Sequence, residues 1–353
     1  ESIVYLTQWP GIGFEISISD GTAAGTVPIV DLEPGRDSAG ASHLTRFGDS
    51  VYFVATTSAH GREIFRTDGT AAGTELVADL APGPDDGALI DPSMIAASES
   101  LVFVHENDEG REPWSTTGVG ATILSEINHE PESAGAWPSE LVAFGDHVFF
   151  SADDGVHGPE PWITDGTAGG TRMLRDVNVG ALGSHPGSAV LFQGQIFFSA
   201  GSGGHGTQDR ELWKTDGTTE GTVRFADVFE GPESSKPTNL TVVGDRLFFT
   251  AADADHGTEL WVSDGTAEGT EMVVDIHPET APFSLWIDVT PRFLTAVEDR
   301  LFFVADNGLH GEELWVSDGS ADGTSMVKDL VGGDSHARHL IAYGDKVAFT
   351  AQT

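Results

Sequence analysis

Histidines and carboxylates recur together at regular places in this sequence, and their chemistry could serve a function. Five His-Gly pairs stand shortly before a glutamate. Their histidines are His60, His157, His205, His256 and His310. Acidic or amide residues lie close to several of these pairs, at Asp153, Asp154, Asp253, Asp255, Asp306 and Asn307. Such side chains can bind metal ions, transfer protons or contact a polar ligand.

Calcium is the metal that these residues favour. Ca²⁺ is a hard cation that takes about six to eight oxygen ligands, so the six acidic and amide residues are candidate calcium ligands. Zinc is a weaker alternative, because no two histidines share one loop at ligand spacing and the chain has no Cys. The structural alternative is that His and Asp lock the loops through hydrogen bonds, since buried polar groups are normally paired.

The elements that must position these residues form a repeat. The pattern Glu-x-x-x-(Ser/Thr)-Asp-Gly-Thr recurs along the chain, with one degenerate copy that lacks Asp-Gly-Thr. Its first glutamates are Glu15, Glu63, Glu112, Glu160, Glu211, Glu259 and Glu313, so the spacing is 48 to 54 residues. A period of this length indicates a propeller or a solenoid.

One repeat shows the expected strands. Alternating or aromatic runs predict strands at 240–243, 246–251, 259–263 and 270–275, separated by Gly-Asp and Asp-Gly turns. Four short strands per repeat are typical of a propeller blade. The sequence therefore predicts an all-β, seven-bladed β-propeller of four-stranded antiparallel blades, which forms a single domain over 1–353.

Ring closure is predicted from the strand count. The last blade would take two strands from the C-terminus, at 339–343 and 347–351, and two from the N-terminus. One strand resembling the second strand of a blade, at 4–7, is then surplus. Closure would remove the exposed edges of an open stack. A solenoid is the alternative, but it would need polar caps.

The turn between the third and fourth strands reads Asp-Gly-Thr-x-x-Gly-Thr. We interpret it as structural, with Asp bonding the turn backbone and both glycines at positive φ. The aspartates are Asp20, Asp68, Asp165, Asp216, Asp264 and Asp318. Tryptophans recur on the third strand, and we expect them to pack between blades, with sugar stacking as the alternative. They are Trp114, Trp162, Trp213, Trp261 and Trp315.

The recurring His, Glu and Asp residues are predicted to lie together on one face of the propeller. The loops with the histidines, the glutamates that begin the third strand and an aspartate that ends the fourth strand should share it. These aspartates are Asp31, Asp79, Asp176, Asp227, Asp275 and Asp329. We expect the histidine loops to form a ligand-binding face.

The repeat resembles the bacterial ELWxxDGT-repeat family, also called hyalin-repeat-like. The resemblance rests on Glu211-Leu-Trp-Lys-Thr-Asp-Gly-Thr218, Glu259-Leu-Trp-Val-Ser-Asp-Gly-Thr266 and Glu313-Leu-Trp-Val-Ser-Asp-Gly-Ser320. It covers nearly the whole chain when degenerate copies are counted. It implies an exported or cell-surface protein of bacterial type.

The amino-acid composition excludes several classes of protein. The chain has 17 Lys and Arg against 56 Asp and Glu, a net charge of −39, which repels nucleic acid. No apolar run approaches the roughly 20 residues of a membrane helix. Lys supplies 4 of the 17 basic residues, a balance that suggests a surface adapted to salt.

Near-equal repeats favour a scaffold or a multivalent binder. The first hypothesis is a non-enzymatic secreted or cell-surface propeller, stabilised by Ca²⁺, that recognises glycan or protein partners, as in adhesion. The second is a polysaccharide-acting glycosidase or lyase, which needs a unique constellation where the repeat breaks, around Asp288 or the insertion 207–209. The third is a structural module of a larger extracellular assembly.

Overall fold

The computed structural model describes residues 2–34, 38–83, 87, 94–97, 99–107, 110–129, 135–203, 209–278 and 290–352. The chain divides into two compact units, and each is described by itself. Unit 1 comprises Glu1–Val156 and Trp162–Met173, and unit 2 comprises His157–Pro161 and Leu174–Thr353. The prediction of a single domain over 1–353 stays a prediction.

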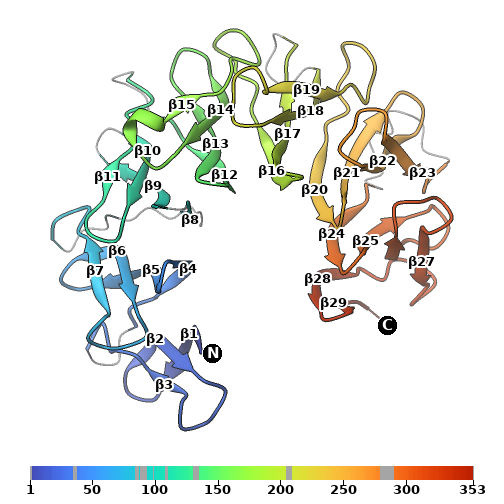
Figure 1. Ribbon diagram of the computed structural model, residues 1–353. Coiled ribbons are helices and arrows are strands. Elements are labelled where there is room, and N and C mark those ends of the chain that lie inside the picture. Colours follow the sequence, from blue (N-terminus) through green and yellow to red (C-terminus); the bar gives the residue numbers. More distant parts are fainter. Residues whose placement is uncertain are drawn as a thin grey trace. The chain divides into compact units, whose positions relative to one another are not determined.

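Unit 1 begins with a three-stranded sheet and continues with four-stranded sheets (Figure 1). The first sheet contains β1 (Ile3–Trp9), β2 (Gly13–Ser19) and β3 (Val27–Pro28). The next contains β4 (Ser42–Phe47), β5 (Ser50–Thr57), β6 (Gly61–Thr67) and β7 (Glu75–Ala78). The third contains β8 (Ile95–Ala96), β9 (Leu101–Asn107), β10 (Gly110–Thr116) and β11 (Thr122–Ile123).

The unit boundary passes through the next sheet, and unit 2 holds the sheets that follow it. The boundary sheet contains β12 (Ser139–Phe144), β13 (His147–Asp153), β14 (Pro159–Thr164) and β15 (Arg172–Met173), with a single 3-10 turn at Ala168–Gly170. Unit 2 continues with β16 (Gly187–Phe192), β17 (Gln195–Gly201), β18 (Arg210–Thr215) and β19 (Val223–Ala226). It then has β20 (Thr238–Val243), β21 (Arg246–Asp253), β22 (Gly257–Ser263) and β23 (Thr270–Val274). The last strands are β24 (Arg292–Val297), β25 (Arg300–Asp306), β26 (Glu312–Ser317), β27 (Ser325–Lys328), β28 (Arg338–Tyr343) and β29 (Lys346–Thr350).

These sheets are the antiparallel blades of a β-propeller, as predicted. Six of the sheets in the described residues have four strands, hydrogen-bonded in chain order. We call the strands of a blade A to D in that order. The predicted strands of the repeat at 240–275 match β20 to β23 within two residues at each end. Among the described residues, there is no helix of the length and apolarity needed to cross a bilayer.

Apolar residues on both faces of the B strands explain how the blades pack. Phe248 and Phe249 follow one another in β21 and are 1% and 0% exposed, because a neighbouring sheet covers each face. Between the last two four-stranded sheets of unit 2, Phe248 joins a core cluster with Phe303 and Trp315. A strand buried on both faces is a continuous apolar run, which is why the B strands lack strict alternation.

The terminal strands form two smaller sheets. β28 pairs with β29, and β1 pairs with β2 from Ile3 opposite Ser19 to Trp9 opposite Gly13. The surplus strand predicted at 4–7 is therefore β1, which takes the place beside β2 that the predicted closure gives to β29. Joining of the terminal sheets into one blade stays a prediction.

Every A strand except β8 carries an irregularity that the sequence did not predict. The second residue of each of these A strands has a left-handed backbone, and the pairing with strand B shifts register there. None of these residues is glycine. They are His43, Glu140, Ser188, Asn239, Phe293 and His339, with φ between 54° and 57°. Left-handed backbone is uncommon for such residues and costs on the order of 1 kcal/mol or more at each one.

Candidate functional site

The glutamate that begins each repeat is a buried clamp on the link between blades. In Glu160, one carboxylate oxygen accepts the Val177 N–H at 3.1 Å and the Ser184 hydroxyl at 2.6 Å. The other oxygen accepts the Asn178 N–H at 3.1 Å. Strand C thus binds both ends of the link that leaves strand D. Because buried carboxylates are costly unless they are hydrogen-bonded, these donors explain why Glu160 tolerates full burial.

The same clamp recurs in other repeats of both units. Glu15, Glu63 and Glu112 in unit 1 accept N–H groups of their own links, and Glu211 and Glu259 do so in unit 2. Each of these side chains is at most 2% exposed. These carboxylates therefore hold loops in place on one end of the blades.

Burial shifts the ionisation of the clamps. It raises the pKa of Glu63 and of Glu160 to about 7 and that of Glu259 to about 8, even though the link N–H groups lower it. The negative charges of Asp79, Asp176 and Asp275 raise these values further. The aspartate that ends strand D thus interacts electrostatically with the clamp of its own repeat.

Glu313 departs from the pattern. It is 0% exposed, and neither of its carboxylate oxygens has a hydrogen-bond partner among the described residues. In its link, the Ser335 hydroxyl donates instead to the Glu312 carbonyl, at 2.8 Å. This repeat keeps the buried glutamate without its clamp.

The histidines bond within their own repeats. The Nδ1 atom of His60 lies 3.0 Å from an Asp79 oxygen, and that of His256 lies 2.8 Å from an Asp253 oxygen. His310 Nδ1 lies 3.2 Å from Asn307 Oδ1. The hydrogen bond that His256 donates to Asp253 raises the pKa of His256. His157 is half-buried, and His205 lies outside the described residues.

Five of the six candidate calcium ligands accept hydrogen bonds from their own loops. Asp153 accepts the Gly155 N–H, Asp154 accepts the Val156 N–H, and Asp306 accepts the Gly308 N–H. Asp253 accepts the Asp255 and His256 N–H groups through one oxygen. These are turn-capping bonds of the kind that Asp and Asn make in loops. Within the described residues, none of the five aspartates joins a group of three His, Cys, Asp or Glu side chains that could hold a metal.

A different acidic group does come together in unit 2. Asp209, Glu211 and Asp227 offer ligand atoms that lie within 4.8 Å of one another. Arg224 binds this group, because its guanidinium donates to Asp209 at 2.6 Å and to Asp227 at 2.9 Å. A cation there would have to displace Arg224.

The Asp-Gly-Thr turns have the geometry of structural turns. In Asp264, one oxygen accepts both the backbone N–H and the hydroxyl of Thr266, which lowers the pKa of Asp264. The Thr266 hydroxyl oxygen in turn accepts the Gly269 N–H at 3.0 Å. The expectation for the glycines was half wrong. Gly265 has φ of 93°, as expected. Position 269 requires glycine for a steric reason instead, because a Cβ there would lie 2.2 Å from Asp264 Oδ1.

Neighbouring glycines of one turn test this requirement. Gly170→Ala is expected to lower the free energy of unfolding by about 1–2 kcal/mol, because its Cβ would lie 2.1 Å from Asp165 Oδ1 and break the turn. Gly169→Ala should be neutral or slightly stabilising, since no atom lies within 4 Å of its Cβ. Urea unfolding of both variants measures the difference. An equal effect of the two would contradict this account.

The recurring tryptophans pack in the interior. Trp315 stacks on Phe303 with ring centroids 6.4 Å apart, and its indole N–H donates to the Ala305 carbonyl at 3.1 Å. Trp162 and Trp261 make the matching contacts with Phe150 and Phe249. Rings held this way contribute to packing between blades rather than to sugar stacking.

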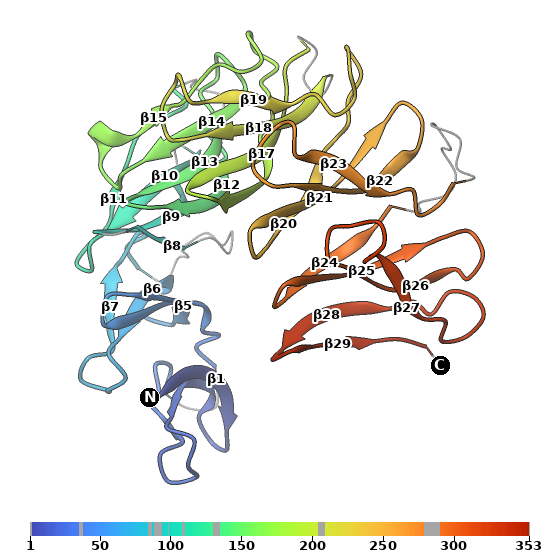
Figure 2. The ribbon, with the colours of Figure 1, turned by 45° about the vertical axis from the view of Figure 1, so that its right-hand side comes forward.

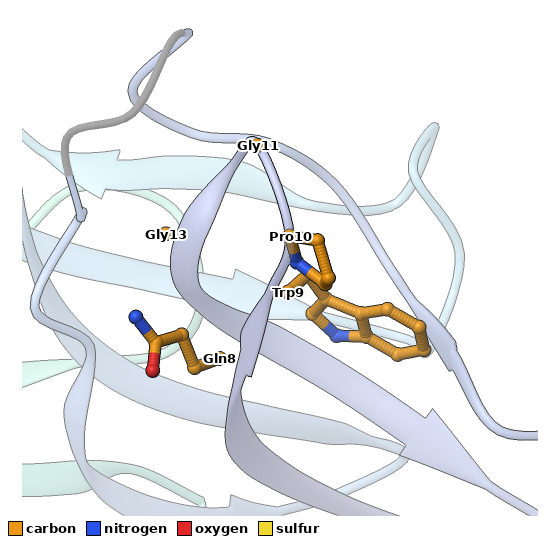
Figure 3. A pocket seen from close by; sticks show the side chains of 5 residues that line it. All are labelled: Gln8, Trp9, Pro10, Gly11 and Gly13. Carbon is orange, nitrogen blue, oxygen red and sulfur yellow. The ribbon is translucent and has the colours of Figure 1, made fainter.

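An open pocket lies at the β1–β2 turn of unit 1. It is lined by Gln8, Trp9, Pro10, Gly11 and Gly13. Figure 3 shows the Trp9 and Pro10 rings side by side and the Gln8 side chain directed away from them. The lining has no ionisable side chain, so this pocket offers apolar contact and amide hydrogen bonds but no acid or base.

Comparison with known proteins supports no family assignment. No protein-family model and no curated protein matches the sequence. Among solved structures, the chain is similar to the β-propeller domain of the Trilobed protease from Pyrococcus furiosus, described as having an open velcro topology. The TM-score is 0.41 at 12% identity, over 93% of this chain and 94% of that one.

Peptidases with further domains also match. A puromycin-hydrolyzing peptidase from Mycobacterium tuberculosis has a TM-score of 0.43 and 12% identity, over 86% of this chain and 50% of that one. An acylaminoacyl peptidase from Pyrococcus horikoshii has a TM-score of 0.41 and 12% identity, over 93% and 50%. This chain spans about half the length of those peptidases. At such identities the likeness concerns the fold and transfers no activity.

Proposed function

We propose that this chain is a non-enzymatic, secreted or cell-surface binding propeller of the ELWxxDGT-repeat type that recognises glycan or protein partners. The supporting observation is the repeated clamp. The recurring glutamates, which could otherwise act as catalytic acids, are buried and bound to link N–H groups in Glu15, Glu63, Glu112, Glu160, Glu211 and Glu259. Their role is to fix loops, and a rigid array of similar loops suits multivalent binding.

A glycan microarray with the purified chain tests the binding role. We expect retention on a subset of glycans, with no release of reducing ends or unsaturated products during long incubation. Turnover would overturn the non-enzymatic part and favour the glycosidase or lyase, whose candidate Asp288 lies outside the described residues. Absence of glycan binding, together with failure to capture any protein partner, would overturn the binding role.

Calcium stabilisation is a second part of this proposal. It is supported by the Asp that ends strand D, because the buried Oδ1 atoms of Asp31, Asp176 and Asp275 have no hydrogen-bond partner among the described residues. Each of these aspartates interacts electrostatically with the clamp of its own repeat. Two carboxylates per repeat would supply oxygen ligands of the kind that Ca²⁺ prefers.

Removal of divalent cations tests this second part. We expect EDTA treatment to lower the melting temperature, and Ca²⁺ to restore it at constant ionic strength, since a ligand that binds only the folded state stabilises it by mass action. Asp176→Asn/Asp275→Asn should reduce the response, while Asp153→Asn/Asp306→Asn should retain it in full. Retention of the response in the first variant and its loss in the second would place the calcium in the histidine loops. No response to EDTA in the parent chain would overturn calcium stabilisation.

A further inference from the structure

Basic and aromatic residues gather where the links of unit 2 enter the A strands. The four segments 185–188, 236–239, 290–293 and 336–339 hold three Lys or Arg and three His, and no Asp or Glu. The whole chain has 56 acidic and 17 basic residues, so the sign of the charge is reversed here. We call these four segments the basic rim.

The basic rim lies at one end of four neighbouring strands. Strands β16, β20, β24 and β28 contact one another in that order within unit 2, and Figure 2 shows β24 and β28 side by side. In three of the segments, the carbonyl of the serine just before the rim accepts a backbone N–H from the end of strand B or just beyond it, as in the 2.8 Å bond from Ala252 N–H to the Ser235 carbonyl. In the fourth segment, Arg292 pairs with Val304 near the end of β25, so all four segments begin their strands on the face of the histidine loops.

The rim side chains reach solvent. Lys236 and Arg338 are exposed, and neither makes an ion pair among the described residues. Phe293 is 43% exposed, with the Arg292 guanidinium 5.7 Å from its ring centroid. Arg292 pairs with Glu312, which also lies 3.9 Å from His336 Nδ1. Lys236 and Arg338 thus remain available for a negatively charged ligand.

The backbone of the rim is strained at these residues. Lys236, Phe293 and His339 have φ of 50°, 57° and 55°, where glycine would fit without cost. The same conformation occurs at Trp137 and Glu140 in another blade, so it is a feature of the repeat. At the rim it places charged and aromatic residues where glycine would fit without backbone cost.

We propose that the basic rim binds the acid groups of an anionic oligosaccharide, and this rests on the proposed binding function. Lys236 and Arg338 would contact the acid groups, and Phe293 would stack on a sugar ring. The exposed Asn239 side chain, whose Nδ2 donates to the Thr250 hydroxyl at 3.1 Å, adds an amide oxygen that can accept from a sugar hydroxyl. A nucleic acid is disfavoured because a long polyanion would extend beyond the rim onto the acidic remainder of the chain, whose net charge of −39 repels it, whereas a short oligosaccharide can be confined to the rim.

Calorimetric titration at 0.15 M NaCl tests this site with three probes. They are tetragalacturonate, its methyl ester, and a sulfated tetrasaccharide. We expect one or both charged probes to bind, which identifies carboxylate or sulfate as the favoured group, and the ester to bind at least tenfold more weakly. Lys236→Glu/Arg338→Glu should weaken the charged probe at least tenfold. The control Lys328→Glu/Lys346→Glu makes the same change in net charge at exposed positions outside the rim and should stay within twofold.

Two further measurements keep the test decisive. Lys236→Gly should weaken binding and raise the melting temperature by relieving strain, which separates lost binding from lost folding. Equal losses in the rim and control variants would overturn the inference, as would binding of the ester as tightly as the acid. Preferential binding of a single-stranded oligonucleotide at the rim would overturn it too. Binding of neutral glycans on the array, unchanged in the rim variant, would overturn the inference and leave the proposed function standing.

Discussion

Replacing Glu160 with alanine is expected to lower the free energy of unfolding by about 3–5 kcal/mol, because a buried hydrogen-bond network is broken. The substitution leaves the Val177 and Asn178 N–H groups and the Ser184 hydroxyl without their acceptor. It also opens a cavity in a position that is fully buried. Guanidinium unfolding, followed by circular dichroism and by tryptophan fluorescence, measures the change and tests whether the transition is two-state.

Glu313→Ala is the matched control for that experiment. Glu313 occupies the same repeat position and is equally buried, but its carboxylate accepts no hydrogen bond from the described residues. Its loss should cost about 1–2 kcal/mol or less, since removing an unpaired buried carboxylate offsets part of the cavity cost. A loss equal to that of Glu160→Ala would show that volume, and not the clamp, explains both effects.

Raising the pH from 6.5 to 8.5 is expected to lower the free energy of unfolding by about 2–4 kcal/mol. The folded-state pKa of Glu63 and Glu160 is about 7 and that of Glu259 about 8, all above the ordinary value of 4.5. A carboxyl group with a raised folded-state pKa stabilises fully below its unfolded pKa. That contribution is lost as the pH rises through the folded-state pKa. The loss should therefore continue to about pH 8.

Other groups set the acidic limit of this range. Burial lowers the pKa of His105 to about 4, and threonine hydrogen bonds lower the pKa of turn aspartates such as Asp264. These groups lose their stabilising contribution as the pH falls, so they oppose the trend below about pH 6.5. Denaturant unfolding at fixed ionic strength measures the profile. Glu259→Gln should reduce the alkaline decline, and a flat or rising profile from pH 6.5 to 8.5 would contradict the assignment.

The sequence was sufficient to predict the strands of a blade because the patterns that define them are local in sequence. The apolar run of β21 and the turns on either side of it lie within a few dozen residues, and each strand is read from its own pattern. The roles of Asp264 and Trp315 followed from turn chemistry and from ring size. The pairing of β1 with β2 was not foreseen, because two strands of the same type compete for one neighbour.

The chemistry of the links was harder to predict, because it depends on the path of irregular backbone. Glu160 was identified as a recurring residue, but its donors, Val177 and Asn178, lie in a segment with no regular pattern. The left-handed residues such as Asn239 were also missed, since non-glycine residues rarely adopt that conformation. Before Ser188 and Asn239, a Ser-x-Pro sequence, at 184–186 and 235–237, is the signal that could have located them.

The clamp also bears on how such a chain folds and grows. Each clamping glutamate finds its partners within the next 24 residues, as Glu211 does with Ser235, so the bonds that fix a link are made inside one repeat. Short sequence separation keeps the entropy of loop closure small and favours rapid assembly of each blade. A whole repeat can then be duplicated together with the hydrogen bonds that fix its own link, and only its packing against the adjacent blades has to adapt.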